Sequence, residues 1–422
     1  TPDPDPIIYL SGGPGGPVEG LVAAFRGPAA ENFTATRDFI IFDQRGVGRS
    51  QPALNCPEVA ERFLQDAPRA LNPDEEDDHF IAAARQCRDR LVRQGIDLAA
   101  YTTAQSAADV NAIRTALGYD QINLLGVSYG TTLALAVLRD FPEIVRSAVL
   151  DSVAPPQVDW LEEIAPAFDR ALNLNFATCV AQQQCLMDVE TLQAAFGRAF
   201  ANLNAQPVTV AVTDPRGRPT DYVVTGHRLV SLIHGSLYNP ASIEVMPALI
   251  EELSRGEETA LRGLVRQRFP ALSRFSISVG MHLSVLCGEQ VSADSMAKAE
   301  AAERDLLPEI RDSYSIRDIV TICAEWPVEK VEGGSPGAVE SDRPALVLAS
   351  ANDPITPPTY GQAAAATLSR SFYVETPGIG HGVFGSGCGG SIIMRFFADP
   401  STRPGTACTA RMGVTFPTTP PP

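Results

Sequence analysis

The chain contains short, almost wholly apolar runs, and a turn or a helical pattern follows each of them. The runs are PIIYL (6–10), DFIIFD (38–43), INLLGV (122–127), SAVLDSV (147–153), PALVLAS (344–350) and SFYVET (371–376). Such runs are typical of strands buried on both faces of a parallel sheet. Their alternation with helical stretches predicts an α/β fold with a doubly wound, mostly parallel sheet. In one such stretch, 104–119, we expect Ala108, Ile113 and Leu117 to lie near one face.

This alternation stops between about residues 155 and 340, where helical patterns dominate. One segment there, PVTVAVTDPRGRPTDYVVTG (207–226), alternates with period two around a Pro/Gly turn and predicts a hairpin. We therefore predict a core formed by residues 1–154 and 341–422, with an inserted, largely helical cap at 155–340. The stretch EGGSPGAVESDRP (332–344) is expected to be the exposed return linker, and the tail FPTTPPP (416–422) to be extended or disordered.

Charge and composition exclude several classes of function. The net charge of −17 repels phosphate backbones and no basic stripe stands out, so we expect no nucleic-acid partner. No run approaches the roughly 18 apolar residues of a membrane span. Nothing in the sequence calls for a metal or an organic cofactor, and it leaves the oligomeric state open.

The cysteines predict an exported protein. Their number is even, they are widely spread, and none lies in a C-x-x-C pair, which suits disulfides formed in an oxidising compartment. Pairing sequence neighbours gives Cys56–Cys87, Cys179–Cys185, Cys287–Cys323 and Cys388–Cys408, although sequence alone does not determine the connectivity. The chain begins TPDPDP without Met, as a mature exported form or a trimmed one would. We expect a secreted or periplasmic location.

A nucleophile motif follows the third apolar run. In LLGVSYGTTLAL, Gly126, Ser128 and Gly130 form G-x-S-x-G between a predicted strand and a predicted helix. In such an elbow the serine sits on a sharp turn at the head of the helix, and the flanking glycines avoid clashes with the neighbouring backbone. The alternative is a purely structural turn. We predict that Ser128 is a catalytic nucleophile.

A serine nucleophile needs a general base and an acid that orients it. Of five histidines, His381 alone follows the last predicted strand, in the glycine-rich loop TPGIGHGVFG. Asp353 lies just past the preceding strand, in ASANDPITPP. In α/β hydrolases the order along the chain is serine, acid, histidine, which matches these positions. The alternatives are a turn histidine and a helix-capping or turn aspartate.

Several further motifs carry a resemblance to a known family. SGGPGG (11–16) and FDQRGVGRS (42–50) resemble its glycine-proline loop and its D-Q-R-G-x-G-x-S signature, and GVSYGTTLAL, NDPITPP and GIGHG match its three catalytic loops. The chain resembles the prolyl iminopeptidase and tripeptidyl aminopeptidase family of serine peptidases. VLCGEQ (285–290) and CAEWP (323–327) are similar to cysteine motifs of the secreted tripeptidyl branch. The chain departs from the pattern at Ser11, where the prolyl branch has histidine, and at Glu289, where aspartate is expected.

The resemblance implies an α/β-hydrolase fold and an aminopeptidase that cleaves short peptides from their N-terminus through an acyl-enzyme on Ser128. It implies an oxyanion hole made by the backbone N–H groups of Gly13 and Tyr129. It also implies that the cap holds the substrate's ammonium beside carboxylates, for which Glu289 and then Glu325 are the candidates. Asp43 and Arg45 are expected to brace the turn beside the oxyanion loop.

Two other functions are open at this stage. The same triad attacks esters as readily as amides, so a carboxylesterase or lipase acting on a small acyl substrate is the first alternative. A binding protein that retains a hydrolase shell without activity is the second.

Overall fold

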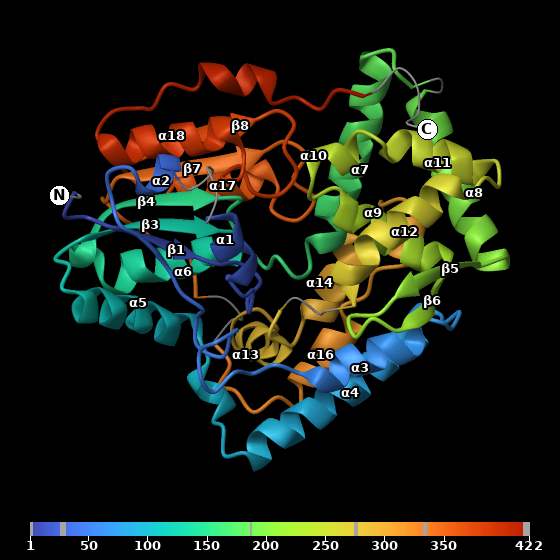
Figure 1. The fold of residues 1–422 in the computed structure, drawn as a ribbon, viewed down its shortest axis with the longest axis horizontal. Helices are drawn as coiled ribbons and strands as arrows, with labels where there is room; N and C mark the ends of the chain where they lie inside the picture. Colours follow the sequence, from blue (N-terminus) through green and yellow to red (C-terminus); the bar gives the residue numbers. More distant parts are fainter. Residues whose placement is uncertain (1–2, 26–30, 186–187, 274–276, 332–335, 417–422) are drawn as a thin grey trace.

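A parallel sheet forms the core of one half of the molecule, on the left in Figure 1. The computed structural model describes residues 3–25, 31–185, 188–273, 277–331 and 336–416. The strand order is β2-β1-β3-β4-β7-β8, and every neighbouring pair is parallel. The strands are β1 (Ile7–Leu10), β2 (Phe39–Ile41), β3 (Ile122–Val127), β4 (Val145–Asp151), β7 (Ala345–Ser350) and β8 (Ser371–Thr376). Each coincides with one of the apolar runs, so the predicted α/β class is confirmed.

Helices cover both faces of this sheet. Because side chains alternate along a strand, Leu124 joins the core on one face and Leu125 the core on the other. The first face packs against α5 (Thr103–Leu117), α6 (Tyr129–Asp140) and α17 (Pro358–Ala365), and the second against α2 (Glu31–Thr34) and α18 (Gly387–Ala398). The remaining short helical segments of the core are α1 (Glu19–Ala24), η2 (Leu98–Ala100), η3 (Pro142–Ile144) and η5 (Ala407–Arg411).

The face predicted for the helix at 104–119 is wrong. Leu117 is 53% exposed, whereas Ala107 and Val110 are fully buried against the sheet. The helix ends at Leu117, beside the C-cap Gly118, so its last turn extends past the edge of the core.

A mostly helical insertion connects β4 to β7. Its helices are α7 (Ile164–Ala181), α8 (Val189–Ala205), α9 (Gly226–Ser236), α10 (Pro240–Ile243), α11 (Met246–Ser254), α12 (Thr259–Leu272), α13 (Val279–Glu289), α14 (Ser295–Ala302), α15 (Pro308–Arg311) and α16 (Arg317–Cys323). The predicted hairpin is present as the antiparallel pair β5 (Val208–Thr213) and β6 (Pro219–Val224). Phenylalanines of α7, α8 and α12 form the centre of the insertion's own core, namely Phe168, Phe176, Phe196 and Phe269.

Two helices from the first part of the chain pack with this insertion (Figure 1). These are α3 (Pro57–Asp66) and α4 (Pro73–Arg93), which lie below the sheet in the view. Helix α4 contacts α16 and α13, and Phe63 of α3 packs against Tyr222 and Phe269. Cys87 and Leu91 of α4 share a buried cluster with Met281 of α13 and Ile322 of α16. The predicted domain boundaries at residues 154 and 340 therefore separate the strands of the sheet from the insertion. They assign α3 and α4 to the core, although these two helices pack against the cap.

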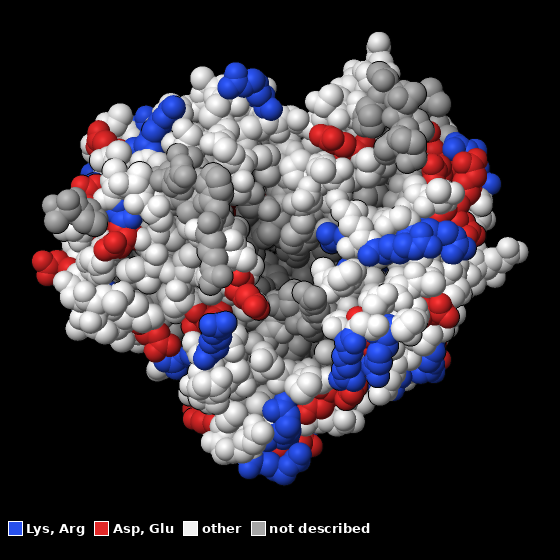
Figure 2. Space-filling model, in the orientation of Figure 1, with Lys and Arg blue, Asp and Glu red and all other residues white. Residues whose placement is uncertain are grey.

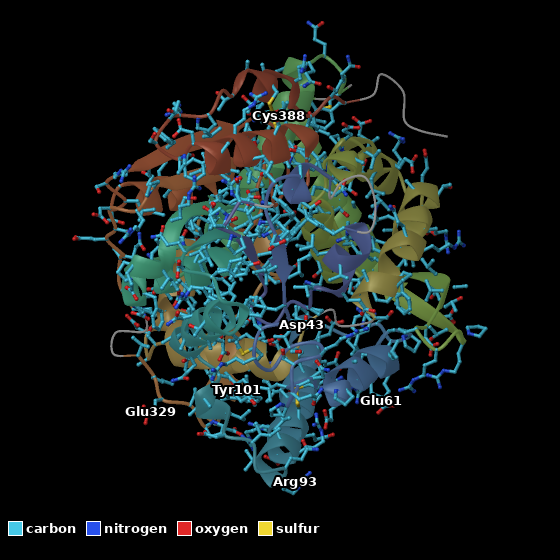
Figure 3. The ribbon with its side chains drawn as sticks, turned by 60° about the vertical axis from the view of Figure 1, so that its left-hand side comes forward. Asp43, Glu61, Arg93, Tyr101, Glu329 and Cys388 are labelled. Atoms are coloured by element: carbon cyan, nitrogen blue, oxygen red, sulfur yellow. A yellow bond between two sulfur atoms is a disulfide. The ribbon has the colours of Figure 1, made fainter. Side chains whose placement is uncertain are left out.

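Four disulfides join sequence neighbours, Cys56–Cys87, Cys179–Cys185, Cys287–Cys323 and Cys388–Cys408. They are spread over the molecule (Figure 3). Cys388 lies on α18 at one end, and the Cys56–Cys87 bond links the N-cap of α3 to α4 at the opposite end, where Glu61 and Arg93 are labelled. Disulfides of this number are compatible with an exported protein. Among the described residues, no helix is long and apolar enough to cross a membrane. The greater part of the proline-rich tail, 417–422, and positions 332–335 of the predicted linker lie outside the described residues.

Candidate active site

Ser128 occupies a tight turn between β3 and α6. Its backbone has φ 58° and ψ −130°, a conformation that residues with a side chain rarely adopt. Both flanking glycines are required by close backbone contacts. A Cβ at Gly126 would lie 2.4 Å from the carbonyl oxygen of Gly130, and a Cβ at Gly130 would lie 2.0 Å from that of Leu10. The G-x-S-x-G motif thus forms the strand-turn-helix geometry of a nucleophile elbow.

Asp353 and His381 form a hydrogen-bonded pair beyond the ends of β7 and β8. His381 Nδ1 lies 2.9 Å from Asp353 Oδ2 and 3.1 Å from Oδ1. The buried carboxylate also accepts bonds from the backbone N–H groups of Ile355 and Thr356 and from the Thr356 hydroxyl. Since Asp353 accepts at Nδ1–H, the Nε2 atom of His381 is the one free to take a proton.

The histidine loop lies next to the nucleophile turn. A Cβ on Gly382 would stand 3.8 Å from Cγ1 of Val127, the residue before Ser128. The described contacts therefore bring together the loops of the three residues predicted to be catalytic. The catalytic roles of these three residues remain a prediction.

Electrostatics favour a charged pair of acid and histidine. Burial would raise the pKa of Asp353, but the charge and hydrogen bond of His381 and the two amides outweigh it and hold that pKa below its usual value. For His381, burial works to lower the pKa, but the charge and hydrogen bond of Asp353, with a contribution from Asp151, raise it above the usual value. Asp353 is thus suited to stabilise an imidazolium.

Residues that the sequence analysis missed support the histidine loop. Asp151, at the end of β4, accepts bonds from the N–H groups of Val383 (3.0 Å) and Phe384 (2.7 Å), and burial raises its own pKa to about 6. Tyr238, just beyond α9, accepts the His381 N–H on its carbonyl (3.2 Å), and its ring lies edge-on to the imidazole at 5.0 Å. Nothing in the spacing of these residues along the chain indicates that they meet.

The glycine-proline loop lies against the nucleophile. A Cβ at Gly12 would lie 2.8 Å from Ser128 Cβ and 3.3 Å from its Oγ, so only glycine permits this approach. Gly13 has φ +119°, which also favours glycine, and it precedes Pro14. This loop is therefore close enough to Ser128 to present backbone N–H groups to a substrate carbonyl bound there.

Asp43 and Gln44 of the D-Q-R-G segment hold this loop, whereas Arg45, expected to do so with Asp43, bonds to Asp109 and the Ala100 carbonyl instead. Asp43, near the middle of the molecule in Figure 3, accepts the N–H groups of Val18 (3.0 Å) and Arg49 (2.9 Å). Gln44 donates to the Ser11 carbonyl at 2.8 Å. Arg45 makes a bidentate pair with Asp109, both distances being 2.7 Å.

The two predicted substrate carboxylates require correction. Glu325 lies at the surface, where Arg85 and Arg88 of α4 pair with its carboxylate and lower its pKa to about 2. Glu289 is 6% exposed, and its two oxygens accept from the backbone N–H and the hydroxyl of Thr103. We therefore no longer assign either residue to the substrate's ammonium.

A pocket of about 300 Å³ lies beside Glu289, but neither Ser128 nor His381 lines it. Cationic groups of Arg139 and Lys330 contribute to its wall. The molecular surface is instead hollowed between the half that contains the sheet and the half formed by the cap helices (Figure 2). In the described part of the chain, no group of three or more His, Cys, Asp or Glu side chains is arranged to hold a metal ion.

Sequence comparison places this architecture in a family. The family model described as the alpha/beta hydrolase fold matches residues 5–387. The chain belongs to the alpha/beta hydrolase fold family. This α/β hydrolase is thus a hydrolytic enzyme by family, and its elbow, acid loop and histidine loop follow the order expected there.

The α/β hydrolase has relatives named as peptidases and as an esterase. It is 26% identical over 379 residues to serine protease Hip1 of Mycobacterium tuberculosis, covering 84% of this chain and 71% of that protein. It is 38% identical over 159 residues to tripeptidyl aminopeptidase of Streptomyces lividans, covering 36% and 29%. It is 30% identical over 424 residues to carboxylesterase B of M. tuberculosis, covering 94% and 78%.

A solved structure, the proline iminopeptidase-related protein of Thermus thermophilus, is 17% identical to this α/β hydrolase. The superposition has a TM-score of 0.36 and covers 89% of this chain and 83% of that one. A similarity of this size adds nothing to the family assignment.

Proposed function

We propose that this α/β hydrolase is a serine aminopeptidase in which Ser128, His381 and Asp353 form the catalytic triad. The observation that carries the proposal is the buried Asp353–His381 pair, whose loop lies against the strained turn of Ser128. The relatives named serine protease and tripeptidyl aminopeptidase favour peptides as substrates.

In the proposed reaction, Ser128 Oγ attacks the scissile carbonyl while His381 Nε2 removes the hydroxyl proton. The carbonyl π pair moves to oxygen, and the backbone N–H groups of Gly13 and Tyr129 stabilise the oxyanion. The intermediate collapses, the C–N bond breaks, and His381 returns the proton to the leaving amine. A water molecule, deprotonated by His381, then attacks the acyl-enzyme and releases the N-terminal fragment with Ser128 protonated again.

Selectivity for a free N-terminus requires a carboxylate that binds the substrate's ammonium. We assign this role to Glu162 in place of Glu289 and Glu325. Glu162 is 4% exposed, and burial raises its pKa, although a hydrogen bond with Ser295 and the charge of Lys298 oppose that rise. Tyr360 has an unpartnered hydroxyl, and the charges of Glu163, Glu162 and Asp353 add to burial in raising its pKa. The charges of Glu162 and Asp353 thus act on the same tyrosine, and a buried carboxylate is suited to accept an ammonium.

The test compares free and N-acylated aminoacyl, dipeptidyl and tripeptidyl anilides with short-chain esters. We expect stoichiometric labelling by a fluorophosphonate that Ser128→Ala abolishes, and cleavage of anilides only when the amine is free. Glu162→Gln should raise KM for free-amine substrates at least about tenfold, because the ammonium loses its counter-charge. Glu163→Gln, at an exposed neighbouring position, is the matched control and should leave KM unchanged.

An absence of labelling in the native protein would contradict the serine-hydrolase proposal. Cleavage of N-acylated anilides at the same rate would contradict the aminopeptidase assignment alone. Rapid ester hydrolysis without anilide cleavage would favour the second candidate, a carboxylesterase, which the similarity to carboxylesterase B supports. Export to an oxidising compartment is part of the proposal and is supported by the disulfides.

A further inference from the structure

Helix α13 (Val279–Glu289) runs between two segments that surround Ser128. Its eleven residues span about 16 Å at 1.5 Å per residue. All of them except His282 are buried. One end of this helix contacts the glycine-proline loop, and the other end connects to the residue that follows the nucleophile.

The N-terminal end of α13 holds the glycine-proline loop by two hydrogen bonds. Ser278 N–H donates to the Gly15 carbonyl at 2.8 Å, and His282 Nδ1 lies 3.1 Å from the Pro14 carbonyl. Because a carbonyl only accepts, Nδ1 of His282 is the protonated nitrogen. A Cβ at Gly15 would lie 2.7 Å from the Ser278 carbonyl, so the loop and the helix are in close contact.

The C-terminal end of α13 reaches Tyr129 through a chain of hydrogen bonds. The Glu289 carboxylate accepts from Thr103 N–H at 2.7 Å and from Thr103 Oγ1 at 2.5 Å. Thr103 Oγ1 has one proton, which it gives to Glu289, so at 2.8 Å it accepts from the Tyr129 hydroxyl. The far end of the Tyr129 side chain is thereby fixed while its backbone N–H lies at the nucleophile turn.

The two segments also touch each other directly. The contact of Gly130 with the Leu10 carbonyl brings the first turn of α6 against the strand that leads into the loop. A Cβ at Gly12 would lie 2.8 Å from Ser128 Cβ, so neither segment moves without disturbing the other.

We propose that α13 positions both halves of the oxyanion hole, with His282 acting on the Gly13 half and Glu289, through Thr103, acting on the Tyr129 half. This inference rests on the proposed function. His282, Glu289 and Thr103 are positioning residues: they touch no reacting atom but determine where the two N–H donors point. Since donors must lie at about 2.7–3.1 Å from the oxyanion, small displacements lower the rate without weakening substrate binding.

The central experiment replaces Thr103 by Val, which retains the volume and the backbone N–H but removes the hydroxyl. We expect kcat to fall at least about tenfold with KM changed less than about twofold, because the donor is needed in the transition state. The inhibition constant of a peptidyl trifluoromethyl ketone, whose hemiketal oxyanion occupies the hole, should weaken by the same factor. Thr103→Ser should restore both values, and His282→Leu should reproduce the loss from the other end of the helix.

Ser284→Ala is the matched control on the same helix. Ser284 is buried and accepts a bond from Trp326 Nε1 at 3.0 Å, on a path that leads away from Ser128. This change should lower Tm while kcat and the ketone's inhibition constant stay the same. All rates are divided by the concentration of sites titrated with a fluorophosphonate, so that unfolded protein does not contribute.

The inference is overturned if Thr103→Val lowers Tm as Ser284→Ala does but leaves kcat and ketone binding at the wild-type values. That outcome is separable from failure of the proposed function. In the latter case the wild-type protein itself takes up no fluorophosphonate and hydrolyses none of the substrates.

Discussion

At the scale of single residues, the balance of charge around His381 determines the pKa of its imidazole. The imidazole lies between Asp353, which hydrogen-bonds its Nδ1, and Asp151 at the end of β4. Both carboxylates favour the protonated ring against the opposing effect of burial, and the result is a pKa above the ordinary value of 6.5. In the proposed mechanism the ring is the general base, so it must be neutral before it can remove the serine proton.

The pH profile of kcat/KM follows from this balance. Activity should be lost as the pH falls through the raised pKa of His381, so the acid limb should lie above pH 6.5. Asp353→Asn removes the larger of the two favourable charges, so the limb should shift to lower pH while kcat falls by about 10⁴. Rates measured from pH 5 to 9 with one substrate give both quantities. An acid limb at or below pH 6.5 in the wild type contradicts the raised pKa.

At the scale of elements, a cap helix supports the acid loop. Arg170 on α7 donates to the carbonyl of Ala351 at 2.7 Å and to that of Asp353 at 2.7 Å. It bonds the backbone and leaves the Asp353 carboxylate to His381. A fixed loop backbone keeps Asp353 in line with the imidazole.

Arg170→Met tests this support, because methionine retains the apolar stem and removes both donors. We expect kcat to fall roughly tenfold and stability to fall by about 1–3 kcal/mol, since two buried carbonyls lose their partner. The pH limb should stay in place because the Asp353 charge is unchanged. Arg262 of α12 donates to the Thr209 carbonyl within the cap, so Arg262→Met is the control. Equal kcat losses in both variants would show that Arg170 has no specific role at the acid loop.

Local pattern predicted the elements but not the contacts between distant segments. The six strands were predicted because burial on both faces gives apolar runs, and the acid and histidine loops because they follow the last two strands. The bond between Thr103 and Glu289 joins residues 186 positions apart, and no spacing indicates it. Glu289 was assigned to the substrate because the family resemblance implies a carboxylate in the cap beside the ammonium, and its bonds to Thr103 could not be foreseen. Thr356 could have been found, since a hydroxyl three residues after Asp353 is typical of a turn capped by aspartate.

At the scale of the whole molecule, the cap is bonded to three loops of the candidate site. Arg170 holds the acid loop, the Tyr238 carbonyl accepts from the histidine loop, and His282 bonds the glycine-proline loop. The insertion and the sheet are therefore expected to unfold together, although each has its own hydrophobic core.

Denaturation provides a direct test of this coupling. The two tryptophans, Trp160 and Trp326, both lie in the insertion, so fluorescence reports on the cap while activity reports on the site. In urea, with disulfides intact, the two transitions should have the same midpoint. Far-ultraviolet circular dichroism serves as the global control. A fluorescence transition that is complete while activity persists would show that the cap unfolds independently.

The bonds between the cap and these three loops have a consequence for engineering. A cap transplanted from another hydrolase onto this sheet would lack the partners of Asp353, His381 and Pro14 unless equivalents of Arg170, Tyr238 and His282 came with it. New specificity is therefore more accessible by exchanging side chains that line the hollow between the two halves than by exchanging the cap itself.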